Sequence, residues 1–162
     1  MASPGKVFEQ DFQKSCPESA YIYRLKDNAA SFAKGTNTRF TSHNMCDYLL
    51  FDNKSRTLYF LELKSTKSSS VPLSMIRETQ IKELTEASNN NLIAGFVVNF
   101  REKDNFTGFI SIKDFNRMMN EINKKSFNIE DLKKYRVIEI KSEKKRTRYK
   151  YNIENFINKT KL

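Results

Sequence analysis

Apolar residues recur along the chain at two spacings, and each spacing predicts a type of secondary structure. Residues 93–100 form a nearly continuous apolar run, which is typical of a strand buried on both faces. Between residues 113 and 124, apolar side chains recur every three or four positions and predict a helix with a buried stripe. The same reasoning predicts further helices at 6–15, 72–87, 129–134 and 152–159, and further strands at 20–25, 47–52, 57–64, 106–112 and 137–140.

Polar stretches separate these elements and are predicted to be loops. Residues 26–44 are rich in Thr, Ser and Asn, which favours a long, mobile loop, and 65–71 form a second polar loop. Helices alternate with strands, and neither an internal repeat nor a domain boundary is visible. The sequence therefore predicts one α/β domain over residues 1–162, with a mixed sheet flanked by helices and a basic C-terminal segment at 141–162.

Charge narrows the partners that the chain can attract. Its 162 residues include 29 Lys and Arg against 19 Asp and Glu, a net charge of +10. Such a domain attracts polyanions, nucleic acid first and an anionic membrane surface second. The chain is also rich in Lys and Asn, as an AT-rich genome favours whatever the function. Charge alone therefore leaves nucleic-acid binding open.

The location and redox state follow from what the sequence lacks. No apolar run approaches the roughly 18 residues of a membrane span, and the start of the chain shows no secretory signal. Two cysteines, Cys16 and Cys46, are too few for a disulfide framework. We therefore expect a cytoplasmic protein with reduced thiols and no membrane partner. No glycine-rich phosphate-binding motif is present, so no nucleotide cofactor is expected.

The strongest candidate for chemistry is a group of charged residues on the two strands around residues 47–64. A turn at 53–56 joins these strands into a hairpin, which can set Asp47 beside Glu62. Glu62 and Lys64 are two positions apart on one strand, so they point to the same side. Two carboxylates and one ammonium would then meet at the rim of the sheet.

This group is suited to metal-assisted hydrolysis of a phosphodiester. Two carboxylates can hold Mg²⁺ through hard oxygens, and the metal would lower the pKa of a bound water. The nearby Lys64 could orient that water or stabilise charge on the phosphate. Glu9, on the first helix, could add a third carboxylate. The alternative interpretation is a solvated strand face on which Glu and Lys alternate.

Asp47 together with Glu62-Leu63-Lys64 resembles the Asp…Glu-x-Lys motif of the PD-(D/E)XK nuclease superfamily, with Cys46 where the motif has proline. The chain more closely resembles the RecU-type Holliday junction resolvases of Gram-positive bacteria and their phages. The segments that carry this resemblance are 5–9, 47–48, 61–66, 80–81 and 94–100.

The resemblance implies a restriction-endonuclease-like core and a homodimer that binds four-way DNA junctions and nicks two opposed strands with Mg²⁺ or Mn²⁺. It also implies a role for each site residue. Asp47 and Glu62 would bind the metal, Glu9 would complete the cluster, Lys64 would position the attacking water and Gln80 would support the site. Between Arg24 and Asp47, where the family inserts a stalk, this chain is short and poor in apolar residues. How that segment contacts a junction therefore stays open.

Contacts with the DNA backbone are expected from basic residues that flank this site in sequence. For each of them, and for the basic run at 144–148, an ordinary solvated surface is the alternative. Two other functions also remain open, a nuclease of the same superfamily that acts on duplex or flap DNA and a non-catalytic basic DNA-binding module. The predicted DNA contacts are Arg24, Lys34, Arg39, Lys67 and Arg77.

Overall fold

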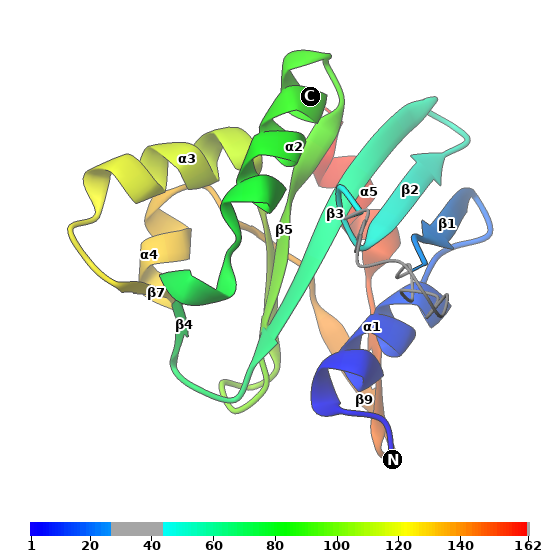
Figure 1. The fold of residues 1–162 in the computed structure, drawn as a ribbon. Coiled ribbons are helices and arrows are strands. Elements are labelled where there is room, and N and C mark those ends of the chain that lie inside the picture. The colour runs from blue at the N-terminus through cyan, green and yellow to red at the C-terminus, as the bar shows by residue number, and fades with distance from the viewer. Residues whose placement is uncertain (27–43, 162) are drawn as a thin grey trace, which may run out of the picture.

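A mixed β-sheet forms the centre of the molecule in the computed structural model, which describes residues 1–26 and 44–161. In these residues the sheet has the strand order β1-β2-β3-β5-β6-β8 (Figure 1). Strands β3 and β5 are parallel, and the other neighbours are antiparallel. The strands are β1 (Ala20–Arg24), β2 (Tyr48–Asp52), β3 (Thr57–Thr66), β5 (Ile93–Phe100), β6 (Phe106–Ser111) and β8 (Ile138–Glu139).

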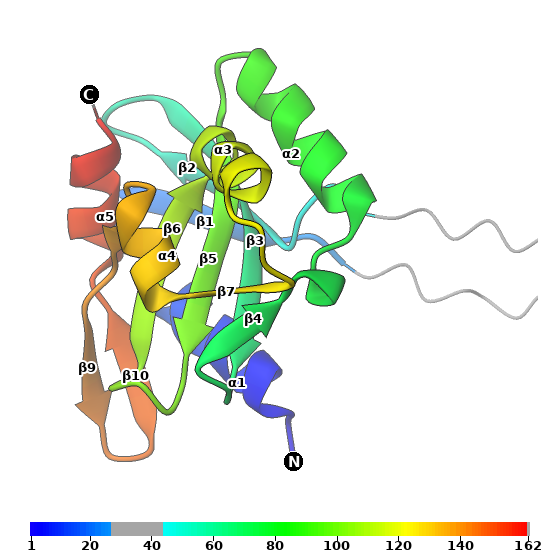
Figure 2. The same cartoon turned by 90° about the vertical axis from the view of Figure 1, so that its left-hand side faces the viewer.

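Helices cover both faces of the sheet and create two hydrophobic cores (Figures 1 and 2). On one face α2 (Glu78–Asn89), α3 (Ile112–Glu121) and α4 (Ile129–Lys134) pack over the central strands. On the other face lie α1 (Pro4–Lys14) and α5 (Ile153–Thr160). The expected fold class, an α/β core with a mixed sheet flanked by helices, is confirmed.

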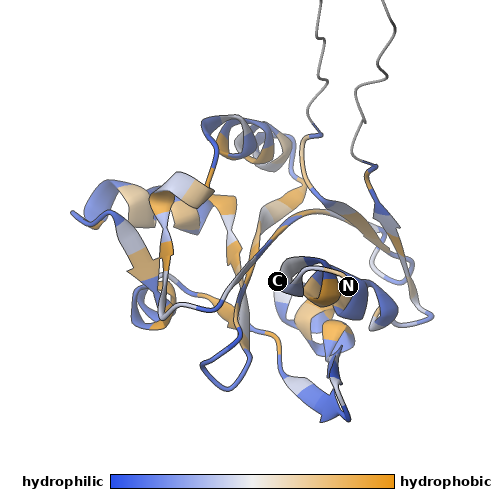
Figure 3. Ribbon diagram, turned by 60° about the horizontal axis from the view of Figure 1, so that its bottom comes forward, coloured by the Kyte–Doolittle hydropathy of each residue, from blue (hydrophilic) through white to orange (hydrophobic). Residues whose placement is uncertain are grey.

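Strand β5 shows why its sequence is apolar throughout. Phe96 and Val98 are buried in the α2 core, whereas Val97 between them is buried in the α1 core. Alternate side chains thus serve opposite faces, and both faces are covered. Figure 3 shows the same contrast in hydropathy, with central strands that are largely hydrophobic and helices that carry both kinds of residue. Gly95 is required here, because a Cβ at this position would lie 2.1 Å from the backbone oxygen of Ile110.

Two small ribbons complete the described fold. Strand β4 (Ser70–Pro72) pairs with β7 (Ser126–Asn128), and β9 (Ser142–Lys145) pairs with β10 (Arg148–Tyr151). The basic C-terminal run thus forms an exposed hairpin, and whether it contacts DNA stays a prediction. Within the described residues, no helix is long and apolar enough to cross a membrane.

The structure corrects the predicted boundaries around residues 65–78. The expected loop at 65–71 is wrong at both ends, because β3 continues to Thr66 by pairing with β5 and because 70–72 form β4. The helix predicted to open at 72 begins at Glu78, after a 3₁₀ turn at Leu73–Met75. The later start has a local cause, since Gln80 Oε1 accepts a hydrogen bond from the Arg77 backbone N–H at 3.1 Å. That bond satisfies an amide at the N-terminal end of the helix.

Candidate active site

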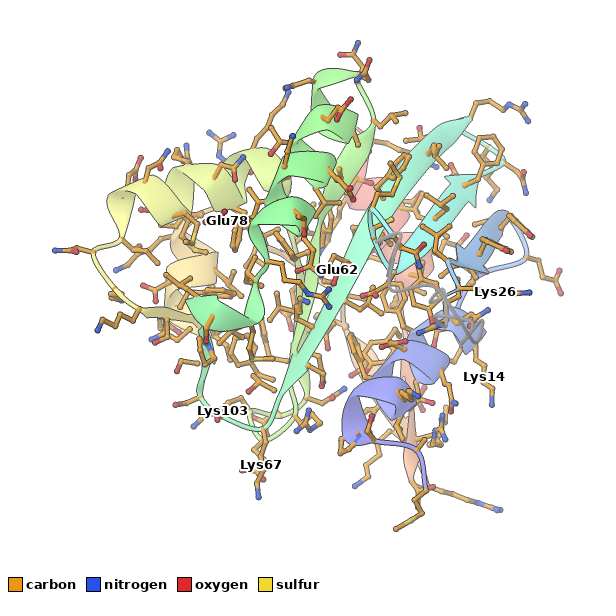
Figure 4. All side chains as sticks on the ribbon, in the orientation of Figure 1. Lys14, Lys26, Glu62, Lys67, Glu78 and Lys103 are labelled. Atoms are coloured by element: carbon orange, nitrogen blue, oxygen red, sulfur yellow. The ribbon has the colours of Figure 1, made fainter. Side chains whose placement is uncertain are left out.

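Asp47 and Glu62 are brought together by the register of the β2–β3 hairpin. Tyr48, the first residue of β2, pairs with Leu61, so Asp47 lies opposite Glu62. The backbone N–H of Leu63 donates to Asp47 Oδ2 at 2.7 Å and fixes the carboxylate against β3. Glu62 is 4% exposed and lies between β3 and α2 (Figure 4). The two carboxylates thus share one face of the sheet, as the predicted hairpin implied.

Lys64 and Gln80 both donate hydrogen bonds to the same oxygen of Glu62. Lys64 Nζ lies 2.9 Å from Glu62 Oε1, and Gln80 Nε2 also contacts that atom. The other end of the Gln80 amide accepts the bond from Arg77 that starts α2. One side chain therefore holds the N-terminus of α2 and the orientation of Glu62 at the same time. The sequence placed Gln80 at the site through its family resemblance, and the structure shows what it contacts.

Burial makes negative charge costly at this position. Burial, together with the neighbouring Glu62 charge, raises the pKa of Asp47 to about 7, although the Leu63 N–H favours the charged form. Burial also raises the pKa of Glu62, while the Lys64 ammonium opposes that rise. Two neighbouring buried carboxylates therefore resist being ionised together. A cation placed between them would remove that penalty.

The chemistry of these donors fits a hard divalent cation. Within the described residues, hydrogen bonds occupy Asp47 Oδ2 and Glu62 Oε1, and each carboxylate has a second oxygen. Mg²⁺ commonly binds one or two carboxylates and keeps several of its waters. In the described ranges 1–26 and 44–161, no group of three or more His, Cys, Asp or Glu residues is arranged to hold a metal. The fit therefore rests on the Asp47–Glu62 pair.

Glu9 approaches this pair from the other side of the sheet. Its Oε2 accepts a hydrogen bond from Arg24 Nε at 3.1 Å, and its backbone oxygen accepts one from the Tyr48 hydroxyl at 3.4 Å. The Glu9 charge still contributes to the raised pKa of both Asp47 and Glu62. Glu9 thus lies near the carboxylate pair, with Arg24 as its partner. No sequence pattern indicated this ion pair, because Glu9 and Arg24 lie on different elements.

The predicted DNA-contact residues lie in different surroundings. Arg24 contacts Glu9, and Arg77 is exposed at the start of α2, where its charge favours ionisation of Glu62. Lys67 follows β3 and is largely exposed, with its Nζ 3.7 Å from Glu102. Lys34 and Arg39 lie outside the described residues. Whether any of these residues contacts DNA stays a prediction.

Cys46 is a site neighbour whose role the sequence did not indicate. Its side chain is 2% exposed, and its Sγ lies 3.3 Å from the backbone oxygen of Tyr48. Burial, with the charges of Glu62 and Asp47, raises the pKa of the Cys46 thiol to about 12. A thiol in that state is neutral and acts as a small apolar residue beneath the carboxylates. Its position directly before Asp47, where the motif that this segment resembles has proline, was the available signal.

Comparison with known proteins gives one family. A family model described as "RecU: Recombination protein U" matches residues 14–157, a range that contains Asp47, Glu62, Lys64 and Gln80 but not Glu9. A SPbeta prophage-derived uncharacterized protein, YotM of Bacillus subtilis strain 168, is 36% identical over 163 residues. That match covers 91% of this chain and 81% of the relative.

Among solved structures, the fold is similar to that of Hjc from Archaeoglobus fulgidus, a Holliday junction resolvase from an archaeal hyperthermophile. The TM-score is 0.51 with 17% sequence identity, and the match covers 83% of this chain and 95% of the archaeal protein. At this identity the likeness concerns the fold. It shows that the arrangement of sheet and helices described above occurs in a protein that resolves junctions.

Proposed function

We propose a nuclease function on the premise that the chain belongs to the RecU (recombination protein U) family. The protein is a metal-dependent endodeoxyribonuclease that resolves four-way (Holliday) junctions by hydrolysing phosphodiester bonds in two opposed strands. The observation that carries this proposal is the group of buried Glu62 with half-buried Asp47 and Lys64, in which Gln80 at the start of α2 holds Glu62. The shared fold with an archaeal resolvase supports it.

Each residue of the group has a distinct task in this proposal. Asp47 and Glu62 would hold Mg²⁺ or Mn²⁺ through their carboxylate oxygens. When bound, the cation would stabilise charge on the phosphate and supply a water of lowered pKa. Glu9 would add negative charge from the α1 side, with its orientation fixed by Arg24.

Lys64 is the residue placed to position the attacking water. Its ammonium has three N–H donors, and one of them is directed to Glu62 Oε1 at 2.9 Å. The remaining donors can hold a water or a phosphate oxygen beside the same carboxylate. Gln80 donates to the same oxygen from α2 and so helps to fix the orientation of Glu62 before the reaction.

The substrate also determines the form of the active protein. A four-way junction has two-fold symmetry, and a homodimer presents two identical sites related by the same symmetry. Each copy, proposed as one nuclease domain over residues 1–162, would nick one of the two opposed strands. Paired symmetric nicks then follow from the symmetry of the complex. The basic net charge would supply most of the affinity through phosphate contacts.

The decisive experiment compares a synthetic mobile four-way junction with a linear duplex of the same sequence. Each strand is end-labelled in turn, and cleavage is followed with Mg²⁺ or Mn²⁺. We expect paired symmetric nicks in the junction, abolished by Glu62→Ala with binding retained. Glu86→Ala, which removes an exposed carboxylate from α2, is the matched control and should cleave normally.

Two results would replace the proposal with one of the open alternatives. Equal cleavage of linear duplex would indicate a nuclease of the same superfamily with another substrate. Tight binding without cleavage in either metal would indicate a DNA-binding protein on a nuclease fold. Light scattering of the free protein tests the homodimer independently.

A further inference from the structure

Strand β1 presents two exposed tyrosines at the edge of the sheet. Tyr21 is 62% exposed and Tyr23 is 41% exposed, although aromatic rings in this fold are otherwise mostly buried. Ile22 between them packs into the α1 core on the opposite face. Side chains alternate along a strand, so both tyrosines point to the face that carries α2 and Glu62. In Figure 1, α2 lies over β5, and β1 forms the edge of the sheet on the other side of β2 and β3.

Tyr23 is the exposed ring nearest to the catalytic group. It pairs with Leu49 across the β1–β2 ladder, and the ladder continues by one bond, from the Leu25 N–H to the Asp47 backbone oxygen at 2.9 Å. Tyr23 is therefore a diagonal neighbour of Asp47 on the same face. Diagonal neighbours in an antiparallel pair lie about 7–8 Å apart, within reach of an aromatic side chain.

A cation lies near each end of this aromatic edge. Lys26, two residues after the last residue of β1, is exposed. At the other end of the ladder the guanidinium carbon of Arg56 lies 5.1 Å from the centroid of the Phe51 ring. Phe51 pairs with Tyr21, so the stacked arginine belongs to the same surface. An aromatic platform flanked by cations is the combination that binds single-stranded nucleic acid, with bases on the rings and phosphates on the cations.

We propose that Tyr23 stacks on an unpaired base next to the phosphodiester that is cleaved, and so makes the enzyme prefer branched DNA. This inference rests on the proposed function, because it assumes that Asp47 and Glu62 mark the scissile phosphate. In a continuous duplex every base is already stacked between its neighbours. At the centre of a junction a base can leave the stack, and an exposed ring beside the site then stabilises that conformation.

The charge of this surface favours DNA over a second copy of the chain. A two-fold interface places the same patch of each subunit against itself. Such an interface would place the patch that carries Lys26 and Arg56 against the same cationic patch of the other copy, with a net charge of +10 on each chain. A polyanion instead neutralises these cations. DNA is therefore the occupant to which the proposal commits.

Binding is tested first, without cleavage. Junctions carry 2-aminopurine, a fluorescent base, at the branch point, and the protein carries Glu62→Gln so that the strands stay intact with Mg²⁺ present. We expect a fluorescence change on binding that disappears when Tyr23→Ala is added and persists with Tyr23→Trp. A change that is the same with and without Tyr23 would overturn the inference.

Cleavage provides the second readout. In the otherwise unchanged protein, Tyr23→Ala should reduce the ratio of junction to duplex cleavage about ten-fold, the scale of one lost base stack. Tyr23→Trp should keep that ratio because it keeps a flat ring. Tyr21→Ala is the position comparison, since it removes an exposed tyrosine two positions farther from Asp47, and it should reduce that ratio less than Tyr23→Ala does. Equal losses in both alanine variants would remove the assignment to Tyr23.

The outcomes separate this inference from the proposed function. If the wild type neither binds nor cuts junctions, the proposed function fails. If the wild type resolves junctions and Tyr23→Ala does so with unchanged preference, only the inference fails. Light scattering of Tyr23→Ala tests whether a second copy of the chain, rather than DNA, binds at this tyrosine. Loss of the dimer together with loss of junction preference would assign Tyr23 to a subunit contact and overturn the inference. Thermal unfolding confirms that each variant is folded.

Discussion

At the scale of single residues, Gln80 shows how one side chain can serve both fold and chemistry. Its amide oxygen accepts from the Arg77 N–H at the start of α2, and its amide nitrogen donates to Glu62. The two tasks can be separated by substitution. Glutamate keeps an acceptor for the helix but replaces the donor to Glu62 with a negative oxygen. Alanine removes both interactions.

We therefore predict different effects of Gln80→Glu and Gln80→Ala. The glutamate should lower the single-turnover cleavage rate at least about ten-fold, because it places like charge against a catalytic carboxylate. The alanine should also lower the free energy of unfolding by about 1–2 kcal/mol, since a helix-start bond and a buried partner are lost. Rapid-quench cleavage and urea unfolding measure the two effects. Thr79→Ala, an exposed position in the same turn, is the control. Normal cleavage by Gln80→Glu would contradict the role given to this amide.

Local residue patterns were sufficient to predict the centre of the site. Alternation along a strand placed Glu62 and Lys64 on one side, and a short turn placed Asp47 opposite them. Both rules act within about twenty residues of chain. The pair of Glu9 with Arg24 could not be predicted in this way, because it depends on how α1 packs across the sheet. The predicted metal cluster of Asp47, Glu62 and Glu9 therefore stays a prediction in all three members.

At the scale of elements, the β9–β10 hairpin holds α1 in position. Arg148 Nε donates to Asp11 Oδ1 at 2.6 Å, and the Tyr149 N–H donates to Asp11 Oδ2 at 3.1 Å. Asp11 is 4% exposed, so these bonds form in a largely dry environment. Farther along, the Tyr151 N–H donates to Ser15 Oγ. The hairpin thus holds α1, the helix that also carries Glu9, through Asp11 and Ser15.

We predict that Asp11→Asn weakens both the fold and the catalytic step. The amide cannot accept both bonds as a carboxylate does, so the free energy of unfolding should fall by about 1–3 kcal/mol. Because α1 carries Glu9, cleavage at saturating junction should slow while junction affinity stays the same. Filter binding and single-turnover cleavage, compared at a temperature where the variant is fully folded, give the two values. Lys150→Ala, at an exposed position of the hairpin, is the matched control. A destabilised variant that cleaves at the full rate would show that α1 does not position the site.

Elements were predicted well where one period repeats over many residues. The run 93–100 and the stripe of α3 are such cases, and both formed as expected. Boundaries failed around 65–78, where polar residues enter strands because distant partners satisfy them. Ser65 donates to Asn99, which is itself buried and bonded to Asn105 and Thr107. Asp11 and Arg148 lie 137 residues apart, so no local period could have paired them.

At the scale of the whole molecule, the net charge of +10 comes from Lys and Arg residues, many of which are exposed and lie on several elements. Lys67 lies just beyond the catalytic strand β3, at the same end of the molecule as Lys103 (Figure 4). Lys67 is largely exposed and its contact with Glu102 is long, at 3.7 Å, so that contact contributes little to stability. A phosphate of a bound DNA arm would be a stronger partner. Lys67 follows directly after β3, the strand that carries Glu62 and Lys64. It is therefore the described cation best suited to test this contact.

We predict that Lys67→Ala weakens junction binding and makes it less sensitive to salt. Each phosphate contact releases counterions, so removing one should reduce the slope of log affinity against log salt by about 1. The loss should be the same for different junction sequences, because a phosphate contact carries no base information. Fluorescence anisotropy over a range of KCl concentrations measures the slope. Lys159→Ala removes an equally exposed lysine from α5, which covers the other face of the sheet, and should leave the slope unchanged. An unchanged slope in Lys67→Ala as well would show that no phosphate of the bound junction contacts Lys67. The DNA arm would then run along another part of the surface, and Lys67 would be a solvated surface residue.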